Sequence, residues 1–458
     1  MKWSTAPDKV MPVANRAPWT LKAYRLLTAL ALPFANMVLD RRLKRGKEVA
    51  ARLPERRGES SIARPKGPLV WMHAASVGEM LSILPLIDRI RERGVTVLVT
   101  AGTVTAAELA EQRLPAGVIH QFAPLDLPQF VARFLDHWRP NLGLFVESDL
   151  WPNLIMASAE RSIPLILVNG RVSERSFQRW RTVRRTIAAL LSRFDLCLAQ
   201  SAEDATRYAG LGAPRYVLTG NLKLDVPAPP AEPTKLWQLQ AAIDTRLVIA
   251  AASTHPGEEI ELVDVHRTLK HSFPGLLTIL VPRHPERGAA IAGIARGAGL
   301  TFAQRSLGEL PERDTEIYIA DTLGELGLVY RLAPIVFIGG SLVGHGGQNP
   351  IEAAKLGAAI LHGPHVWNFA EIYSALDAVG GAELVSDSSK LTVRIGAWLT
   401  DAEARKKVAQ TGLQAMDTLA GALERTVAAL DPYLVQFRLE RPEGQREAAD
   451  DTDHAGKT

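Results

Sequence analysis

The sequence has one cysteine, few aromatic residues and no long uninterrupted apolar run, and each absence narrows the possible functions. Cys197 alone can form neither an intramolecular disulfide nor a cysteine-based metal cluster, and its apolar surroundings are typical of a core residue. A reducing cytoplasm suits this composition. Aromatic residues make up 6% of the chain and no nucleic-acid-binding module is recognisable, so we expect no nucleic-acid partner.

Several motifs of common α/β enzymes are missing as well. The chain contains no G-x-x-x-x-G-K-[ST] P-loop, no G-x-G-x-x-G turn after its first predicted strand and no G-x-S-x-G nucleophile elbow. Its 11 histidines include no H-E-x-x-H pair and no plausible metal cluster. These absences argue against a P-loop NTPase, a dinucleotide enzyme and an α/β-hydrolase, and we expect no metal site.

Residues 21–39 form an apolar segment that is short for a transmembrane helix. Its uninterrupted apolar part is about fourteen residues, whereas a spanning helix needs about twenty. The basic residues that follow are Arg41, Arg42, Lys44, Arg45 and Lys47. Together with the short apolar segment, they favour a monotopic helix on an anionic membrane surface. A helix packed on the protein itself is the alternative. No cleavage site follows in a convincing position, so a secretory signal is not expected.

Apolar runs alternate with helix-period segments over most of the chain, as in a parallel α/β fold. A first series of predicted strands covers residues 69–73, 95–100, 142–146, 165–169, 196–200 and 216–219. A second series covers 247–251, 276–281, 316–320 and 335–338. Four prolines within residues 226–233 separate the two series, because proline interrupts helices and sheets alike. The patterns predict two Rossmann-like, doubly wound domains that face a cleft.

The predicted organisation has five parts. Residues 1–47 form the anchor and its basic flank, residues 48–225 the first domain, and residues 226–234 a linker. Residues 235–432 form the second domain, whose last helices either stay with it or return to the first domain. Residues 433–458 are polar and charged, and we predict a disordered tail.

Residues 339–352 combine the end of an apolar run, a glycine-rich turn and the start of a helix. Glycine allows the backbone to approach a ligand closely, and a helix start offers free N–H groups and the positive end of a dipole. Pro350 suits the first helical turn, and Glu352 is placed to reach the ribose hydroxyls of a nucleotide. The segment predicts a phosphate-binding turn, with a purely structural turn as the alternative.

Carboxylates follow two strands of the first series. Glu79 opens a helix after the strand 69–73, and ligands of open α/β sheets bind at the carboxyl ends of strands. The helix dipole is expected to keep Glu79 ionised as a weak proton acceptor, with a purely electrostatic role as the alternative. Glu147 and Asp149 follow the strand 142–146 and suit stabilisation of positive charge. Asp149 is equally a candidate N-cap, and Trp151 a candidate packing residue.

Basic residues follow one strand of the second series. Pro282 and then Arg283 follow the strand 276–281, and a guanidinium group at a strand end suits bidentate phosphate binding. Residues 253–258 provide a further helix start of the anion-binding kind. A separate arginine cluster is either a solvated helix face or a contact for lipid phosphates: Arg171, Arg175, Arg179, Arg181, Arg184 and Arg185.

Taken together, nine segments resemble motifs of the 3-deoxy-D-manno-octulosonic acid (Kdo) transferases of Gram-negative lipopolysaccharide synthesis. No single segment is decisive, but all nine occur in family order over roughly residues 20–425. The segments are 73–79, 147–153, 169–173, 220–225, 253–258, 282–287, 321–326, 339–352 and 363–369. Two positions depart from the family pattern: Gln348 stands where histidine is common, and Asp149 where glutamate is common.

The resemblance implies a GT-B fold and an inverting, metal-independent glycosyl transfer without a cofactor. The donor would be CMP-Kdo, a co-substrate, and the acceptor a glucosamine hydroxyl of a lipid A precursor (lipid IVA) at the cytoplasmic side of the inner membrane. Glu79 resembles the general base, and Glu147 and Lys223 resemble transition-state stabilisers. Three segments resemble CMP-binding ones: Pro282 and Arg283; Leu323, Gly324 and Glu325; and Asn349, Pro350, Ile351 and Glu352.

Two rival interpretations share this architecture. Nucleotide-sugar 2-epimerases use UDP-sugars and need no membrane anchor, so residues 21–47 and the nine segments count against them. A membrane-attached nucleotide-sugar-binding protein without catalysis would be expected to lack the predicted base and stabilisers, yet Glu79, Glu147 and Lys223 are present.

Overall fold

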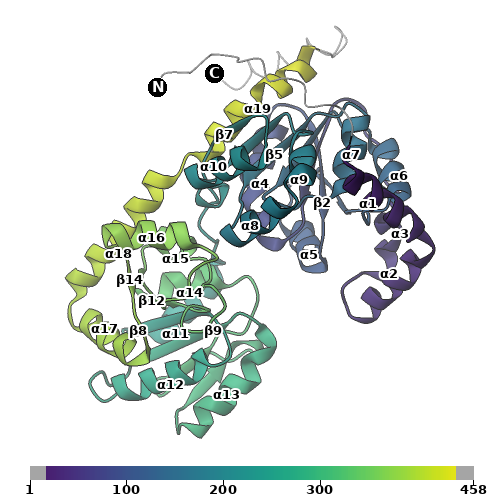
Figure 1. The fold of residues 1–458 in the computed structure, drawn as a ribbon. Helices are drawn as coiled ribbons and strands as arrows, with labels where there is room; N and C mark the ends of the chain where they lie inside the picture. The colour runs from purple at the N-terminus through teal and green to yellow at the C-terminus, as the bar shows by residue number, and fades with distance from the viewer. Residues whose placement is uncertain (1–16, 440–458) are drawn as a thin grey trace, which may run out of the picture. The chain divides into compact units, whose positions relative to one another are not determined.

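The computed structural model describes residues 17–439, which form two compact units. Of the described residues, the first unit holds residues 17–226 and 420–439, and the second unit spans Pro227–Leu419. Each contains a seven-stranded sheet with helices around it (Figure 1). This confirms the predicted pair of Rossmann-like, doubly wound domains. Residues 1–16 of the predicted anchor part and residues 440–458 of the predicted tail lie outside the described residues.

The sheet of the first unit is parallel, with the strand order β3-β2-β1-β4-β5-β6-β7. The chain winds outward in both directions from β1 and β4, so the topological switch point lies between these two strands. The ladder runs from Val70 opposite Leu142 to His73 opposite Phe145, so the two strands end at the same edge. The strands are β1 (Leu69–Ala74), β2 (Thr96–Ala101), β3 (Ile119–Phe122), β4 (Leu142–Val146), β5 (Leu165–Gly170), β6 (Leu196–Ala199) and β7 (Tyr216–Leu218).

Alternating side chains of β1 enter two different cores. Val70 and Met72 pack with the helices of one face, while Leu69 and Trp71 pack with those of the other. Trp71 is fully buried, and its burial contributes about 3 kcal/mol of apolar transfer free energy. The covering helices are α3 (Leu53–Arg56), α4 (Val77–Arg91), α5 (Val104–Arg113), α6 (Pro128–Trp138), α7 (Pro152–Glu160), α8 (Glu174–Thr182), α9 (Arg184–Leu191), α10 (Ala202–Leu211) and α19 (Ala422–Leu439).

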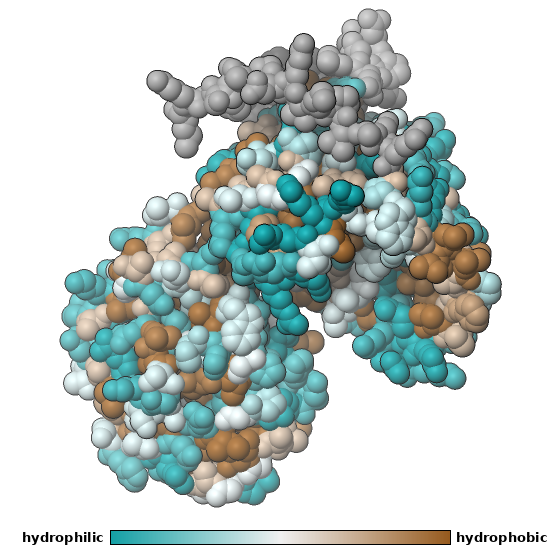
Figure 2. Space-filling view, viewed as in Figure 1, coloured by the Kyte–Doolittle hydropathy of each residue, from teal (hydrophilic) through white to brown (hydrophobic). Residues whose placement is uncertain are grey.

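The predicted anchor segment forms two short helices, α1 (Trp19–Leu30) and α2 (Ala35–Lys44), joined by a 3-10 turn that contains Pro33. Leu21 and Leu39 are fully buried, and α1 packs on α6 and α7. The opposite side is apolar and exposed (Figure 2), through Trp19, Leu26, Leu27, Leu30, Phe34, Met37 and Val38. Between residues 17 and 439, no helix combines the length and the apolar character that crossing a bilayer requires.

The second unit repeats the design with the strand order β10-β11-β9-β8-β12-β13-β14 and a switch point between β8 and β12. Its strands are β8 (Val248–Thr254), β9 (Leu277–Pro282), β10 (Phe302–Gln304), β11 (Ile317–Ile319), β12 (Ile335–Ile338), β13 (Ala359–His362) and β14 (Ala382–Leu384). Its helices are α11 (Pro233–Ile243), α12 (Glu258–Leu269), α13 (Gly288–Gly297), α14 (Leu326–Leu332), α15 (Ile351–Lys355), α16 (Ala370–Val379), α17 (Ser388–Thr400) and α18 (Ala402–Leu419).

The ten predicted strands are present, and the structure adds β3, β10, β13 and β14, none longer than four residues. The predicted disordered tail is wrong for residues 433–439, because α19 continues to Leu439. Leu434 and Phe437, in the part of α19 that follows Pro432, are buried in the core of the first unit, and their burial stabilises this end of the helix.

Candidate active site

Glu79 lies in the first turn of α4, directly after β1. Ser76 is the N-cap and accepts the N–H of Glu79 at 3.3 Å, while Oε1 of Glu79 accepts the Ser76 hydroxyl at 3.0 Å. Oε2 accepts the N–H of Ala75 at 2.7 Å. This reciprocal arrangement resembles a capping box, with the N–H of Ala75 in place of the N–H of the N-cap, and it holds the carboxylate at the carboxyl edge of the sheet.

The carboxyl group of Glu79 titrates near neutral pH. Burial is the largest cause, and the charge of Glu147 adds to it, so that the pKa of Glu79 rises to about 7. The hydrogen bonds from Ala75 and Ser76 oppose this rise but do not cancel it. The sequence-based expectation of a readily ionised, weak base is therefore wrong. Desolvation outweighs the helix dipole, which typically contributes only about 0.3–1 kcal/mol.

Glu147 forms an ion pair with Lys223. Oε1 of Glu147 lies 2.5 Å from Nζ of Lys223, and both side chains are mostly buried. Glu147 follows β4, and Lys223 lies in the 3-10 turn Leu222–Leu224 that follows β7. The structure thus brings together three predicted site residues, since Glu147 acts electrostatically on Glu79.

Asp149, two residues after Glu147, contacts His73 of β1. Its Oδ2 accepts the indole N–H of Trp151 at 2.9 Å and lies 3.5 Å from Nε2 of His73. Nδ1 of His73 in turn lies 3.0 Å from Oγ1 of Thr100. Burial alone would raise the pKa of Asp149, but His73 and Trp151 lower it below its usual value. Asp149 therefore anchors Trp151, and it does not cap α7 as the sequence allowed.

The start of α7 is capped by Asp126, a residue that the sequence patterns did not single out. Its two carboxylate oxygens accept the N–H groups of Asn153 at 3.1 Å and Leu154 at 2.9 Å. Tyr24 of α1 donates its hydroxyl to the same carboxylate at 3.0 Å, and Asn153 Nδ2 donates to Thr28 of α1 at 2.9 Å. The exposed apolar helix α1 is thereby hydrogen-bonded to the segment that follows β4.

In the second unit, a carboxylate of the protein occupies the glycine-rich turn. The fully buried Glu258 accepts the N–H groups of Gly340 at 2.7 Å, and of Ser341, Leu342 and His255 at 3.0 Å each. These groups cannot also bind a phosphate, so residues 340–342 of the predicted phosphate-binding segment 339–352 do not supply its N–H donors. The helix that follows, α15, has five residues and therefore offers only a weak dipole.

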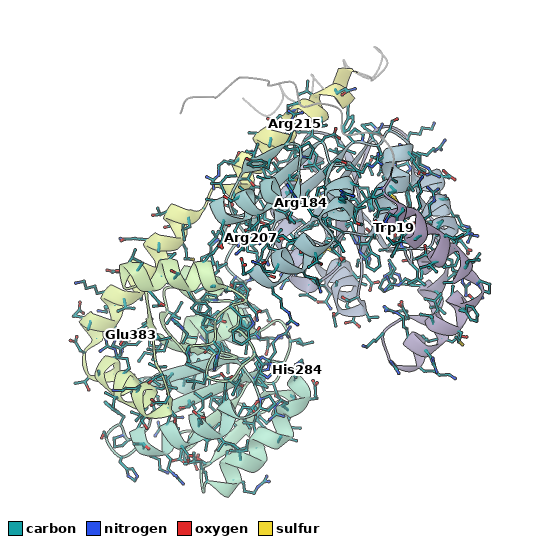
Figure 3. The ribbon with its side chains drawn as sticks, viewed as in Figure 1. Trp19, Arg184, Arg207, Arg215, His284 and Glu383 are labelled. Atoms are coloured by element: carbon teal, nitrogen blue, oxygen red, sulfur yellow. The ribbon has the colours of Figure 1, made fainter. Side chains whose placement is uncertain are left out.

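The predicted CMP-binding residues lie at the carboxyl edge of the second sheet. Arg283 is exposed directly after Pro282, the last residue of β9. Its backbone N–H donates to the backbone carbonyl of Thr254 at 2.9 Å. Beside it, His255 stacks on His345 with ring centroids 4.2 Å apart, and His284 (Figure 3) lies 6.1 Å from His255. Burial and these neighbours lower the pKa of His255 to about 4, so this imidazole is neutral at physiological pH.

Glu325 is engaged within the protein. It binds Arg305 at 3.0 Å, Lys235 at 3.1 Å and the hydroxyl of Thr322 at 2.5 Å. Burial alone would raise the pKa of Glu325, but these partners lower it to about 2. The neighbouring Leu323 is 79% exposed, and Gly324 has a φ of +79°. The exposed part of this turn is therefore Leu323 and Gly324.

Asn349 starts α15. Its Oδ1 accepts the N–H of Ile351 at 3.0 Å, and its Nδ2 donates to Glu352 at 3.2 Å. Pro350 is the residue before this helix and not part of its first turn. Burial raises the pKa of Glu352. In the part of the chain that the structure describes, no three His, Cys, Asp or Glu side chains are grouped so that they could hold a metal ion.

Five of the six arginines of the predicted cluster lie on α8 and α9, and Arg171 precedes α8. The exposed members are Arg175, Arg179, Arg181, Arg184 and Arg185. Arg184 projects from α9, and the nearby Arg207 of α10 (Figure 3) pairs with Glu174 at 2.8 Å and with Glu203. Trp180 and Phe177 hold α8 against the core, so the guanidinium groups are presented on a supported surface.

A family model for 3-deoxy-D-manno-octulosonic-acid transferases matches residues 51–226. A probable mitochondrial 3-deoxy-D-manno-octulosonic acid transferase of Arabidopsis thaliana is 40% identical over 384 residues, which cover 81% of this chain and 86% of the relative. The 3-deoxy-D-manno-octulosonic acid transferase of Haemophilus influenzae is 36% identical, with 82% and 89% covered. That of Bordetella pertussis is 35% identical, with 83% and 91% covered.

Solved structures show the same fold at low sequence identity. A glycosyltransferase of Rickettsia africae has a TM-score of 0.56 at 11% identity, covering 81% of this chain and 99% of its own. A UDP-GlcNAc 2-epimerase of Neisseria meningitidis has a TM-score of 0.56 at 12% identity, covering 79% and 99%. Because glycosyltransferases and epimerases share this architecture, the fold alone does not distinguish between the two activities.

Proposed function

The chain belongs to the 3-deoxy-D-manno-octulosonic acid (Kdo) transferase family, and from this premise we propose that it transfers Kdo from CMP-Kdo to a glucosamine hydroxyl of the lipid A precursor lipid IVA. The transfer inverts the configuration at the sugar and uses neither a metal nor a cofactor. One observation carries the proposal most strongly. A glutamate with a pKa of about 7 lies near an ion pair of Glu147 and Lys223, at the switch point of the first sheet.

In this reaction the acceptor hydroxyl attacks the anomeric carbon of Kdo, and the bond from that carbon to the CMP phosphate oxygen breaks. The hydroxyl proton passes to Glu79, whose pKa near neutrality suits general-base catalysis. Positive charge develops on the sugar and negative charge on the phosphate. Glu147 stabilises the former and Lys223 the latter, because fixed charges in a partly buried site lose little to solvent reorganisation.

The second unit binds the CMP moiety. Arg283 is exposed at a strand end, where a guanidinium group can bind a phosphate through two hydrogen bonds. Leu323 and Gly324 form an exposed turn whose geometry Glu325 fixes through its ion pairs. Asn349 and Glu352 complete the site from the start of α15.

The first unit binds the cytoplasmic face of the inner membrane. The exposed apolar side of α1 and α2 enters the interfacial region, and the basic end of α2 contacts anionic headgroups. Exposed arginines of α8 and α9 contact the phosphates of the lipid acceptor. Tyr24 donates to Asp126, which caps α7, and Thr28 accepts from Asn153 of α7, so the membrane-bound helix is joined to the segment that follows Glu147.

The test supplies the purified protein, in detergent or in vesicles, with lipid IVA and one donor at a time: CMP-Kdo, another CMP-linked acidic sugar, or UDP-GlcNAc. Lipid products are identified by mass. We expect products heavier by whole Kdo units with CMP-Kdo alone, and the mass gives the number transferred. Conversion of UDP-GlcNAc to its 2-epimer would contradict the proposal and favour the rival epimerase activity. Turnover that persists at the same rate when a metal chelator is added supports metal independence.

A further inference from the structure

Two neighbouring strands of the first unit end in residues with a left-handed backbone. Glu147 follows β4 with a φ of +59°, and Asn169 lies at the end of β5 with a φ of +54°. Val146 pairs with Val168, and the N–H of Glu147 donates to the carbonyl of Val168 at 2.9 Å. The two residues are therefore adjacent. Left-handed backbones are uncommon outside glycine, and they concentrate at functional sites.

Asn169 holds the turn that carries Lys223. Its side chain is fully buried, and its Oδ1 accepts the N–H of Leu222 at 2.9 Å. Within the turn, Asn221 accepts the N–H of Lys223 at 3.0 Å. Leu222 is itself buried in the core beside α4, so the turn has one apolar and one polar anchor. Lys223 then reaches Glu147 at 2.5 Å.

The surroundings of Asn169 fix its position but do not use its amide nitrogen. Gln200 Nε2 donates to the carbonyl of Asn169 at 2.9 Å. Within residues 17–439, Nδ2 of Asn169 is buried without a hydrogen-bond partner, which disfavours folding. Glycine would adopt the same backbone without that penalty. What glycine lacks is the Oδ1 acceptor for Leu222, so packing alone does not account for asparagine at this position.

We propose that Asn169 is a positioning residue for the transfer, which acts by setting Lys223 against Glu147. The inference rests on the proposed function, since it assumes that Lys223 stabilises the transition state. An error of about 1 Å in the position of such a group can cost about a hundredfold in rate, so a single buried hydrogen bond to its turn has a measurable effect.

The test is a double-mutant cycle of Asn169→Gly and Lys223→Met, with kcat and KM measured for CMP-Kdo and lipid IVA. Asn169→Gly keeps the backbone and removes Oδ1. We expect kcat to fall about tenfold to a hundredfold with KM for CMP-Kdo unchanged. The double variant should be no slower than Lys223→Met alone, because Asn169 acts through Lys223. Ser162→Gly, at another left-handed position of the same unit, is the matched control and should retain wild-type kcat.

The outcomes distinguish the positioning role of Asn169 from the proposed role of Lys223. Multiplying losses in the double variant, or wild-type kcat in Asn169→Gly, would overturn the positioning role alone. Wild-type turnover in Lys223→Met would overturn the proposed role of Lys223 and the inference with it. If Asn169→Gly does not fold, Asn169→Ser also removes the Oδ1 acceptor for Leu222, and the same cycle with Lys223→Met then decides.

Discussion

Lowering the pH from 8 to 6 should slow transfer about tenfold through Glu79 alone. A general base works only when it is deprotonated, and the pKa of Glu79 is about 7. At pH 8 about nine tenths of the molecules carry the ionised carboxylate, and at pH 6 about one tenth do. The assay is kcat/KM for CMP-Kdo and lipid IVA in closely spaced steps between these values and beyond, at constant ionic strength.

The causes of the raised pKa give a second readout. Burial contributes most and the charge of Glu147 next. Glu147→Gln should therefore move the acid limb of the profile to lower pH while also lowering the maximal rate, since Glu147 is a proposed transition-state stabiliser. Glu92→Gln, at the exposed far end of the same helix, is the matched control and should change neither the limb nor the rate.

The same carboxyl group makes a prediction about stability. Its folded-state pKa is raised above the ordinary value of 4.5, so between these two values the folded state binds more protons than the unfolded state. Stability contributed by the group is thus full at low pH and is lost as the pH rises to about 7. Discounting for partial exposure, Glu79→Gln should raise the free energy of unfolding at pH 8 by about 1–3 kcal/mol, measured by urea denaturation.

Two results would refute this reasoning about Glu79. A rate that stays flat across the acid range would show that no group of this pKa limits the reaction. A limb centred near the ordinary pKa of glutamate would show that Glu79 is solvated during catalysis and that burial does not control it. Loss of activity in Glu79→Gln together with unchanged or higher stability supports a catalytic role, because a structural role would lower both.

Three further predictions concern the rest of the molecule. Lys223→Met should lower kcat about a hundredfold to a thousandfold and lower Tm, since it removes a transition-state charge and leaves Glu147 without this partner; steady-state kinetics and calorimetry measure both. Glu258→Gln should destabilise the second unit by about 3 kcal/mol in denaturant unfolding, because the amide replaces an oxygen that accepts buried N–H groups. Leu26→Gln with Leu30→Gln should weaken vesicle binding without lowering Tm, because both side chains are exposed; unchanged flotation would contradict membrane binding by α1.

The sequence predicted the features of this fold that depend on local patterns. Apolar runs located ten strands, and the position of Glu79 after the first of them placed it at the carboxyl edge of the sheet. The four strands that the sequence did not predict are short, and β3, with His120 and Gln121 at its centre, has no apolar run to mark it. The proline-rich segment indicated the boundary near Val226, whereas the return of the chain to the first unit at Ala420 stayed one of two options.

The parts of the site that sequence reasoning missed depend on contacts between distant residues. Glu258 fills the glycine-rich turn from 82 residues away, and Tyr24 reaches Asp126 across 102 residues. No local pattern signals either contact. The pKa of Glu79 was misjudged for the same reason, since burial depends on the packed core whereas the helix dipole can be read from the sequence.

Kdo transfer with Glu79 as its base is tested by comparing wild type with Glu79→Gln in one assay with CMP-Kdo and lipid IVA, resolved by product mass. We expect a Kdo-bearing lipid and stoichiometric CMP with wild type, and a loss of at least about a hundredfold in the folded variant. Product formation at the wild-type rate by Glu79→Gln would contradict the assignment of the base. Absence of a Kdo-bearing lipid with the folded wild-type protein would contradict the proposed transfer itself.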